Sequence, residues 1–508
     1  MNYFVDVLLG LIILVSSSCV RSDETHKTAK NGNTTTIGEL TPLQAQTDFD
    51  TMRRALEEAH AGLYRHSSKD DMNRRFEACR AQLDRPISRL DFIGIVSGML
   101  ADIRCEHTGL RLDLETETAM SNAPLFPLQL AVENRQLVVM FNDTPDDATI
   151  RPGMEISEIN GRQTYTILDL LLPKLSADGF IETGKRWRLA RNFARNYWLF
   201  VDQSADFKIK ARDAAGKIIT TTLAGVVDND RNREQNPVNA TMLAKTAKFD
   251  WAPENVSLRF VEDSTIAHLH ISGFFGSDYP RSLENTFQTL TEKGTKVLIL
   301  DLRGNGGGND LYGAMLVSYL RDKPFRYFDH IDQTTPVPSF ANWSPDQEQK
   351  SRNTLTPNPA GGYFVTPSGH KGLLEQPPGK FPFTGKVIIL MDGRTFSTAA
   401  DVCAILHHLK LATFVGEESG GGYCGNTSGR GTRVFLPNSQ LTVMIPMWGY
   451  WNAVAETADK HRGTIPDYPV ETKVADLLRG FDAPWEKALK LVTDTLHPTT
   501  NSLQENTK

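Results

Sequence analysis

The hydrophobic positions of residues 41–120 repeat with the period of an α-helix. In DFDTMRRALEEAHAGLY, Phe49, Met52, Leu56 and Leu63 recur at three- and four-residue steps, with charged residues between them. This spacing places the apolar side chains on one face of a helix. The segment LDFIGIVSGMLADI repeats the pattern and leads into RCEHTGLRLD. We therefore predict an N-terminal helical domain over residues 41–120, with His107 on the loop or strand after its last long helix.

Residues 121–225 show a different pattern. Short apolar runs such as LQLAV, QLVVMF and FKIKA alternate with turn residues, which predicts a small β-rich domain. Within it, IRPGMEISEINGRQTYTILDLLLPKL has a Gly turn, a short strand, an Asn-Gly turn and an amphipathic helix, and it resembles the PDZ domain consensus. A PDZ domain binds an extended peptide as an added strand. The alternative is a generic β-domain, because the Gly-rich carboxylate-binding loop of PDZ domains is not evident.

The pattern of residues 240–495 predicts a larger α/β domain. The segments KVLILDLRGNGGGNDLYGAMLVSYL and KVIILMDGRTFSTAADVCAILHHL each contain an apolar strand, a turn and a helix. Strands that are apolar throughout are typical of a sheet that helices cover on both faces. Between them, residues 327–384 are rich in Pro, Asn, Ser and Gly and suggest an insertion or a mobile cover. Residues 496–508 are typical of a disordered tail.

The N-terminal residues are typical of an exported protein. The apolar run in residues 7–15 is too short to span a bilayer and suits a secretory signal over residues 1–19. Three serines directly before Cys19 resemble a bacterial lipoprotein cleavage site, in which that cysteine carries the lipid anchor. An ordinary cleaved signal is the alternative. Residues 20–40 are polar and predict a flexible tether, so the expected location is periplasmic or anchored to the outer membrane of a bacterium.

Composition narrows the class of protein. The 508 residues exceed what one core usually serves, which favours roughly two to four domains. Apolar residues at 40% and charged residues at 23% are ordinary globular values. A net charge of -6 gives no electrostatic reason to expect nucleic acid as a partner. Beyond Cys19, the cysteines Cys79, Cys105, Cys403 and Cys424 have no zinc-site spacing, and incidental thiols are favoured over a disulfide framework.

Ser397 has the local setting of a nucleophile. It follows a buried-type strand and a turn, and it opens a helix, so free N–H groups and the helix dipole would face its oxygen. The alternative is a helix N-cap, a common use of serine at such a junction. The loop DLRGNGGGN has Asn309 where a dinucleotide fingerprint needs its third glycine, and no P-loop lysine follows. A main-chain N–H at or near Gly307 therefore suits an oxyanion, with a plain tight turn as the alternative.

Taken together, these motifs resemble the tail-specific (C-terminal processing) serine peptidases. The set comprises HT after the helical region, the PDZ-like segment, DLRGNGGG, GRTFSTAAD, GEESGGG and GTIPDYPV, and it covers about residues 45–490. The resemblance implies a catalytic domain of the crotonase-like ββα type. It also implies Ser397 as the nucleophile and the N–H groups of Gly307 and Thr398 as the oxyanion hole.

The family divides by the base that takes the serine proton. The lysine of one branch is missing here, because the stretch GEESGGGYCGNTSGRG contains none. The other branch, similar to tricorn protease, uses a histidine that matches His107, and imidazole can accept a proton near neutral pH. The chain departs from that branch by having Glu106 where a serine precedes the histidine. The further carboxylate of that site is also unmatched, and Asp459 or Glu456 could substitute.

Other residues are weaker candidates. His268 and His270 share a strand face but have no third metal ligand at a recognisable spacing, so two core or surface histidines are favoured. Cys424 could be a nucleophile but lacks a strand-turn-helix setting. The aromatic segment around Trp448 could line a substrate pocket or pack in the core.

The sequence thus predicts an exported serine endopeptidase that acts on polypeptides through an acyl-enzyme and needs no metal or organic cofactor. One alternative is a catalytically weak binding protein of the same fold that carries a peptide or a small apolar ligand. Another is a crotonase-like acyl-transfer enzyme that acts on thioesters, although no sign of an adenine-nucleotide pocket is present. The oligomeric state is not predicted.

Overall fold

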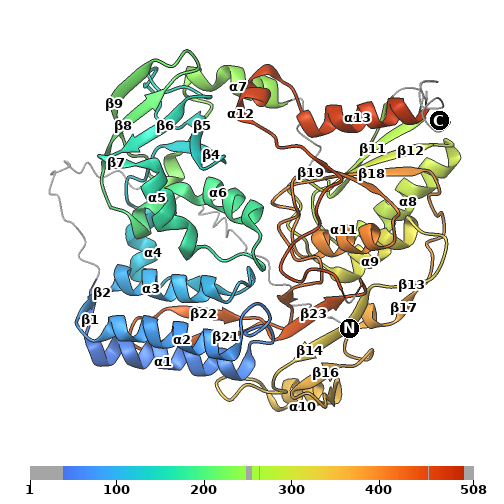
Figure 1. Cartoon of the computed structure of the whole chain (residues 1–508), viewed down its shortest axis with the longest axis horizontal. Coiled ribbons are helices and arrows are strands. Elements are labelled where there is room, and N and C mark those ends of the chain that lie inside the picture. Colours follow the sequence, from blue (N-terminus) through green and yellow to red (C-terminus); the bar gives the residue numbers. More distant parts are fainter. Residues whose placement is uncertain (1–37, 248–253, 262–263, 456, 497–508) are drawn as a thin grey trace, which may run out of the picture.

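The computed structural model describes residues 38–247, 254–261, 264–455 and 457–496. Its N-terminal helices, an antiparallel sheet from residues 128–224 and a larger α/β part are packed together (Figure 1). The predicted signal with Cys19 lies outside the described residues, as do nearly all of the tether 20–40 and the tail 496–508. In the part of the chain that is described, no helix combines the length and hydropathy needed to cross a bilayer.

Helices form the N-terminal part, as the hydrophobic period predicts. They are α1 (Pro42–Ala59), α2 (Lys69–Arg80), α3 (Arg89–Asp102) and α4 (Leu114–Ser121), with the short strands β1 (Glu39–Leu40) and β2 (Ile87–Ser88). Thr41 begins α1 with a capping box: its hydroxyl accepts the Gln44 N–H, and the Gln44 side chain accepts the Thr41 N–H. Phe49, Met52 and Leu56 are fully buried, so the amphipathic prediction is confirmed.

A segment from far along the chain completes the core of these helices. The three-stranded sheet consists of β21 (Thr432–Phe435), β22 (Thr442–Ile445) and β3 (Gly109–Arg111), in that order. Val434 shares a hydrophobic cluster with Phe49 of α1. The pairing of β22 with β3 fixes the strand that begins just after His107. The helical part is therefore not closed by residues 41–120 alone, because its apolar faces need strands that the sequence pattern assigns to residues 240–495.

A six-stranded sheet forms the centre of the α/β part. In spatial order its strands are β10 (Val256–Val261), β11 (Ile266–Ile271), β12 (Val297–Asp301), β18 (Lys386–Met391), β19 (Thr413–Gly416) and β24 (Tyr468–Pro469). All neighbours pair in parallel except β10 and β11.

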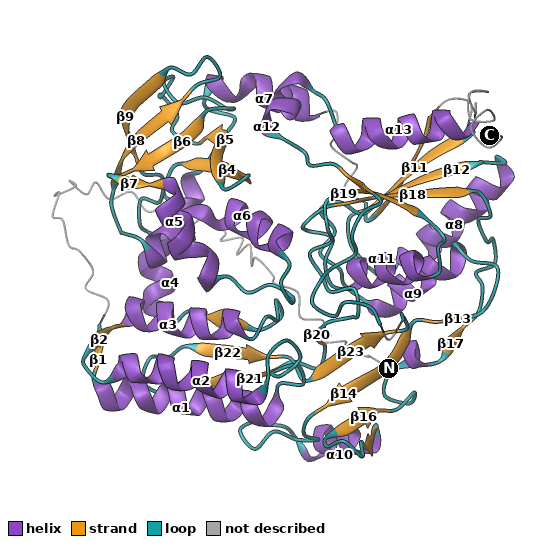
Figure 2. Ribbon diagram, viewed as in Figure 1, coloured by secondary structure: helices purple, strands orange, loops and turns teal. Residues whose placement is uncertain are grey.

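Helices cover both faces of this sheet, as Figure 2 shows. Helices α8 (Tyr279–Glu292), α9 (Asp310–Tyr319) and α11 (Thr398–His408) pack on one face and α13 (Ala483–Leu496) on the other. Every residue of β12 is buried, as expected for a strand that is apolar throughout. Both predicted strand-turn-helix segments, β12 to α9 and β18 to α11, are confirmed. Helices α7 (Ala240–Thr246) and α12 (Val474–Arg479) connect this part to the antiparallel sheet.

The loops that follow β12 and β18 lie side by side. Asp301 of β12 is opposite Leu390 of β18 in the parallel register, so both strands end at the same edge of the sheet. The Phe396 N–H donates to the Asn305 carbonyl at 3.0 Å, which joins the two loops directly. The carboxyl edge of a parallel sheet is where such folds place their ligands.

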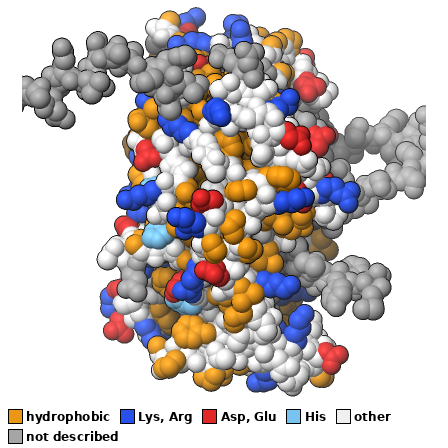
Figure 3. All heavy atoms as spheres, turned by 90° about the vertical axis from the view of Figure 1, so that its right-hand side faces the viewer, with side chains coloured by type: hydrophobic (Ala, Val, Ile, Leu, Met, Phe, Trp, Pro, Cys, Tyr) orange, Lys and Arg blue, Asp and Glu red, His pale blue; other side chains and the backbone are white. Residues whose placement is uncertain are grey.

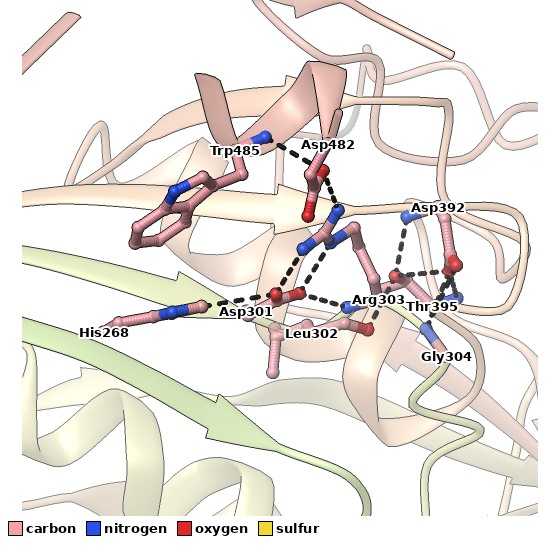
Figure 4. A network of polar contacts seen from close by, with 9 residues as sticks. All are labelled: His268, Asp301, Leu302, Arg303, Gly304, Asp392, Thr395, Asp482 and Trp485. Carbon is pink, nitrogen blue, oxygen red and sulfur yellow. Dashed lines mark hydrogen bonds and ion pairs between the residues drawn. The ribbon is translucent and has the colours of Figure 1, made fainter. Parts of the chain in front are cut away.

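Arg303 anchors the Gly-rich loop to the end of β12 (Figure 4). Its guanidinium donates to both carboxylate oxygens of Asp301, at 2.9 and 2.6 Å, and to Asp482 at 2.7 Å. Burial would raise the pKa of Asp301, but the guanidinium outweighs burial and holds that pKa well below its usual range. His268 lies 3.3 Å from Asp301 and stacks on Trp485. The network therefore accounts for His268 without a metal.

A five-stranded sheet packs beside the first. Its strands in order are β15 (Leu355–Pro357), β16 (Tyr363–Val365), β14 (Phe328–Gln333), β23 (Trp448–Asn452) and β20 (Thr427–Ser428), while β13 (Phe325–Arg326) pairs with β17 (Glu375–Gln376). Residues 327–384, which suggest an insertion or cover, thus supply strands and helix α10 (Pro345–Asn353) to this layer. Trp448 donates to Gln333 at 2.7 Å, so the aromatic segment packs within the sheet.

The antiparallel sheet follows the alternating pattern of residues 121–225. Its path is β4 (Leu128–Glu133), β5 (Gln136–Asn142), β6 (Glu155–Ile159), β8 (Asp206–Arg212) and β9 (Ile218–Ala224), with β7 (Arg162–Gln163) paired to β6. Helices α5 (Thr164–Leu171) and α6 (Glu182–Phe200) pack against its core. On the face of the molecule opposite this sheet, basic, acidic and hydrophobic side chains are interspersed (Figure 3).

Candidate active site

Ser397 lies at the carboxyl edge of the six-stranded sheet, between β18 and α11. Its φ of +54° is in a region that non-glycine residues rarely adopt, and such strain often marks functional positions. Its side chain makes no capping bond to the start of α11. The hydroxyl instead lies 3.2 Å from the Nε2 of His107. The N-cap interpretation of Ser397 is therefore not supported, and the contact is within the looser range seen for a nucleophile and its base without substrate.

His107 lies on the turn between α3 and β3. Its ring stacks on Phe396, with the centroids 4.7 Å apart, so the residue before Ser397 holds the imidazole in place. Burial, together with the positive charges of Arg188 and Arg394, lowers the pKa of His107 to about 3. The imidazole is thus neutral at physiological pH, the state in which it can accept a proton. Its Nδ1 is buried and has no hydrogen-bond partner in the described residues.

The predicted oxyanion donors lie next to the serine. Gly307 has a φ of +95°, and a Cβ there would come 2.7 Å from the Ser397 Cβ and 3.0 Å from the Thr398 nitrogen. Only a glycine therefore fits this close approach. No hydrogen bond among the described residues uses the Thr398 N–H, but the Gly307 N–H already donates to Asn305 Oδ1 at 2.9 Å. Thr398 is the readier donor, and Gly307 would have to share or exchange its bond.

Glu106, which replaces the serine of the tricorn-like branch, and Asp459, one of the two possible substitutes for its carboxylate, both have other partners. Glu106 forms an ion pair with Arg188 of α6. Asp459 accepts the N–H of His461 at 2.8 Å. Glu456 lies outside the described residues. None of the three is shown bonded to the imidazole.

Sequence reasoning missed two side chains beside His107. A ring nitrogen of His107, the sulfur of Cys105 and a carboxylate oxygen of Asp178 all lie within 4.8 Å of one another. Asp178 comes from the loop between α5 and α6, in the stretch SADGF, where no motif singles it out. Three such groups could hold a metal ion. Burial, however, raises the pKa of Cys105 to about 12 and that of Asp178 to about 7, so a metal would have to displace protons from both.

The weaker candidates lie away from this contact. His268 belongs to the Asp301 network, and burial lowers the pKa of its neighbour His270. Cys424 is buried, and burial raises the pKa of its thiol, which disfavours a reactive thiolate. All cysteines of the described residues are free thiols, in keeping with the incidental interpretation.

Residues 265–470, which contain β12, the Gly-rich loop, Ser397 and α11, match the model of peptidase family S41. This segment belongs to that family. The chain therefore carries a serine-type peptidase domain, as the motifs predict. No curated protein matches the whole sequence significantly.

Solved structures share the fold. The crystal structure of mature CPAF is 14% identical, with a TM-score of 0.61, over 90% of this chain and 97% of that one. The structure of mature CPAF complexed with lactacystin is 15% identical, with a TM-score of 0.59, over 90% and 98%. Tricorn protease is 14% identical over 90% of this chain and 37% of its own, with a TM-score of 0.38. At these identities the likeness shows the fold alone.

Proposed function

We propose that this chain is an exported serine endopeptidase that hydrolyses polypeptides through an acyl-enzyme, with Ser397 as the nucleophile and His107 as the general base. The 3.2 Å contact between the serine hydroxyl and the histidine Nε2 carries the proposal. The domain of peptidase family S41 supports the class of reaction. Export rests on residues 1–19 alone.

In this mechanism the Ser397 oxygen attacks the scissile carbonyl carbon while its proton passes to His107 Nε2. The Thr398 N–H, and the Gly307 N–H once its bond to Asn305 is shared, stabilise the negative charge on the carbonyl oxygen. His107 then gives its proton to the leaving amine, and the acyl-enzyme forms. A water molecule, deprotonated by His107, hydrolyses the ester and restores Ser397.

The domain types are part of the same proposal. The parallel strands β11, β12 and β18 with helices α9 and α11 support a crotonase-like catalytic domain. The antiparallel sheet of residues 128–224, with α5 beside it, supports a PDZ-like domain that takes an extended segment of the substrate.

A fluorophosphonate probe tests the nucleophile directly. Stoichiometric labelling of the wild type and casein hydrolysis are expected, and both should disappear in Ser397→Ala, with a loss of activity on the order of 10³-fold or more. Ser368→Ala, which changes an exposed serine, is the matched control and should behave as the wild type. Folded wild-type protein that neither takes the label nor cleaves casein would favour the binding protein. Activity on acyl thioesters without peptidase activity would favour the acyl-transfer enzyme.

A further inference from the structure

The imidazole of His107 faces Ser397 with only one of its nitrogens. Nε2 must be free of a proton to act as the base, so the proton of the neutral ring has to reside on Nδ1. Nδ1 is buried and has no partner in the described residues. A buried N–H without an acceptor is unfavourable, which would favour the wrong tautomer or another ring orientation. A functioning site therefore needs an acceptor on this side of the ring.

Asp178 carries an oxygen that lacks a partner in the same place. The residue is 3% exposed, and its Oδ2 is buried without a hydrogen bond in the described residues. Its Oδ1 accepts the backbone N–H of Glu106 at 2.9 Å. Because Glu106 directly precedes His107, this bond fixes the carboxyl group one residue away from the base.

The two residues that carry these unpartnered atoms are close to each other. A ring nitrogen of His107 and a carboxylate oxygen of Asp178 lie within 4.8 Å. That limit exceeds a hydrogen bond of about 2.6 to 3.2 Å, and catalytic hydrogen bonds commonly tighten only when substrate is bound. Cys105, the third member of the cluster, directs its sulfur at the Thr427 carbonyl, 3.2 Å away, and its thiol is therefore engaged elsewhere.

We infer that Asp178 is the positioning residue of the site, and that its Oδ2 accepts the Nδ1–H of His107 during catalysis. The inference rests on the proposed function and adds to it the group that orients the base. The site then draws on three separate segments: the turn after α3, the loop between α5 and α6, and the start of α11.

The charges around His107 give the carboxylate a second effect. Arg188 and Arg394 both act on the imidazole with positive charge, and Arg188 is already paired with Glu106. When His107 accepts the serine proton, the positive charges of the two arginines destabilise the imidazolium. Burial raises the pKa of Asp178 to about 7, so above that pH its ionised carboxylate would offset this charge, as the buried carboxylate does in serine peptidase triads.

Asp178→Asn tests the inference with little change in shape. The amide oxygen can still accept the Glu106 N–H, but its NH₂ group would face Nδ1 as a donor and favour the wrong tautomer. We expect kcat to fall on the order of 10²- to 10⁴-fold, with KM changed less than about threefold, because the buried Asp178 acts through His107. We also expect the Nδ1–H resonance of His107 to lose its downfield position in the proton NMR spectrum of the variant. A merely structural role would lower the amount of folded enzyme without moving this resonance.

Cys105→Ala is the matched control, since it changes the neighbouring group of the same cluster and should keep kcat within a few-fold of the wild type. A folded Asp178→Asn enzyme with unchanged kcat would overturn the inference. If that variant does not fold, proton NMR of the wild type decides. A strongly downfield Nδ1–H resonance that is absent from His107→Ala supports the contact, and its absence from the wild type overturns it. Failure of the proposed function is a separate result, because it would be seen as a wild type without label or activity, or as activity that persists in Ser397→Ala.

Discussion

Ser397 Oγ and His107 Nε2 lie 3.2 Å apart although 290 positions of sequence separate the two residues. The strand β3, which follows His107, pairs with β22, and the stacking of the imidazole on Phe396 fixes it from the other side. The proposed nucleophile comes from the sheet of the α/β part, whereas the proposed base comes from the helical part. Catalysis at this site should therefore depend both on the Gly-rich loop after β12 and on the contact between the helical part and the α/β part.

Substitutions at two glycines of the Gly-rich loop distinguish the effect of backbone strain on stability from the effect of a close contact with Ser397 on catalysis. Gly307→Ala would place a Cβ 2.7 Å from the Ser397 Cβ, whereas a Cβ on Gly304, which has a φ of +73°, would meet no other atom within 4 Å. We expect Gly307→Ala to lower kcat on the order of 10²-fold or more by displacing Ser397 and its oxyanion donors. Gly304→Ala should cost about 1 kcal/mol or more of stability through backbone strain and keep most of the activity.

Steady-state kinetics with thermal unfolding of both variants checks this. Equal loss of kcat in the two would mean that the effect comes from the loop conformation and not from the approach to Ser397.

The pH dependence of kcat/KM should depend on the burial of His107 and on the charges around it. Burial, with Arg188 and Arg394, lowers the pKa of His107 to about 3, and only the neutral imidazole accepts the serine proton. The acid limb of kcat/KM is therefore expected well below pH 6.5, the ordinary value for histidine. Arg394→Gln removes one positive charge, which raises the pKa of His107 and moves the limb to higher pH.

Arg191→Gln is the control for this measurement, because Arg191 is exposed and does not contribute to the shift of His107. An acid limb near pH 6.5 in the wild type, or one that Arg394→Gln leaves in place, would contradict the prediction.

The two strand-turn-helix segments were predictable because strands buried on both faces are apolar throughout, as in β12 and β18. The pairing of Ser397 with His107 was predictable only through the motifs, since nothing local in EHTGL points to a partner 290 positions away. Asp178 was not predictable: a lone aspartate in a loop has no pattern, and its role depends on a bond to the Glu106 backbone. The packing of the β21–β22 hairpin on the helical core was not predictable either, because the hydrophobic period shows which face of an element is buried but not which distant segment covers it.

Asp401 should make the protein less stable at alkaline pH. It lies one turn after Ser397, is 3% exposed, and accepts hydrogen bonds from Asn452 and Asn426. Burial raises its pKa to about 8 from an ordinary 3.8, so the folded state holds a proton that the unfolded chain has released. The contribution of this proton to the free energy of unfolding is complete below about pH 3.8 and is lost as the pH rises towards 8.

Asp401→Asn removes this titration. We expect the difference in Tm between variant and wild type to shift in favour of the variant from pH 5 to pH 8 and then to level off, as followed by thermal unfolding. The exposed Asp146→Asn should leave the profile unchanged. A difference between Asp401→Asn and wild type that does not vary with pH would contradict this assignment.

Arg65 should hold the helical part on the α/β part. Its buried guanidinium donates to the carbonyls of Cys424, Asn426 and Tyr450, at 2.9 to 3.1 Å, and lies over the Trp451 ring. Arg65→Leu removes three hydrogen bonds from a cation to buried carbonyls, although the carbonyls of Cys424 and Asn426 each keep a backbone donor, and we expect a loss of about 2 kcal/mol or more in the free energy of unfolding.

The exposed Arg74→Leu, which breaks only a surface pair with Asp71, should cost less than about 1 kcal/mol. Urea unfolding gives both values, and kcat of the folded Arg65→Leu enzyme gives the functional consequence. Because the helical part carries His107, looser docking should lower kcat in proportion to the time that the base spends away from Ser397. A destabilised Arg65→Leu enzyme with wild-type kcat would instead show that Phe396 stacking and the β3–β22 pairing hold the base without help from Arg65.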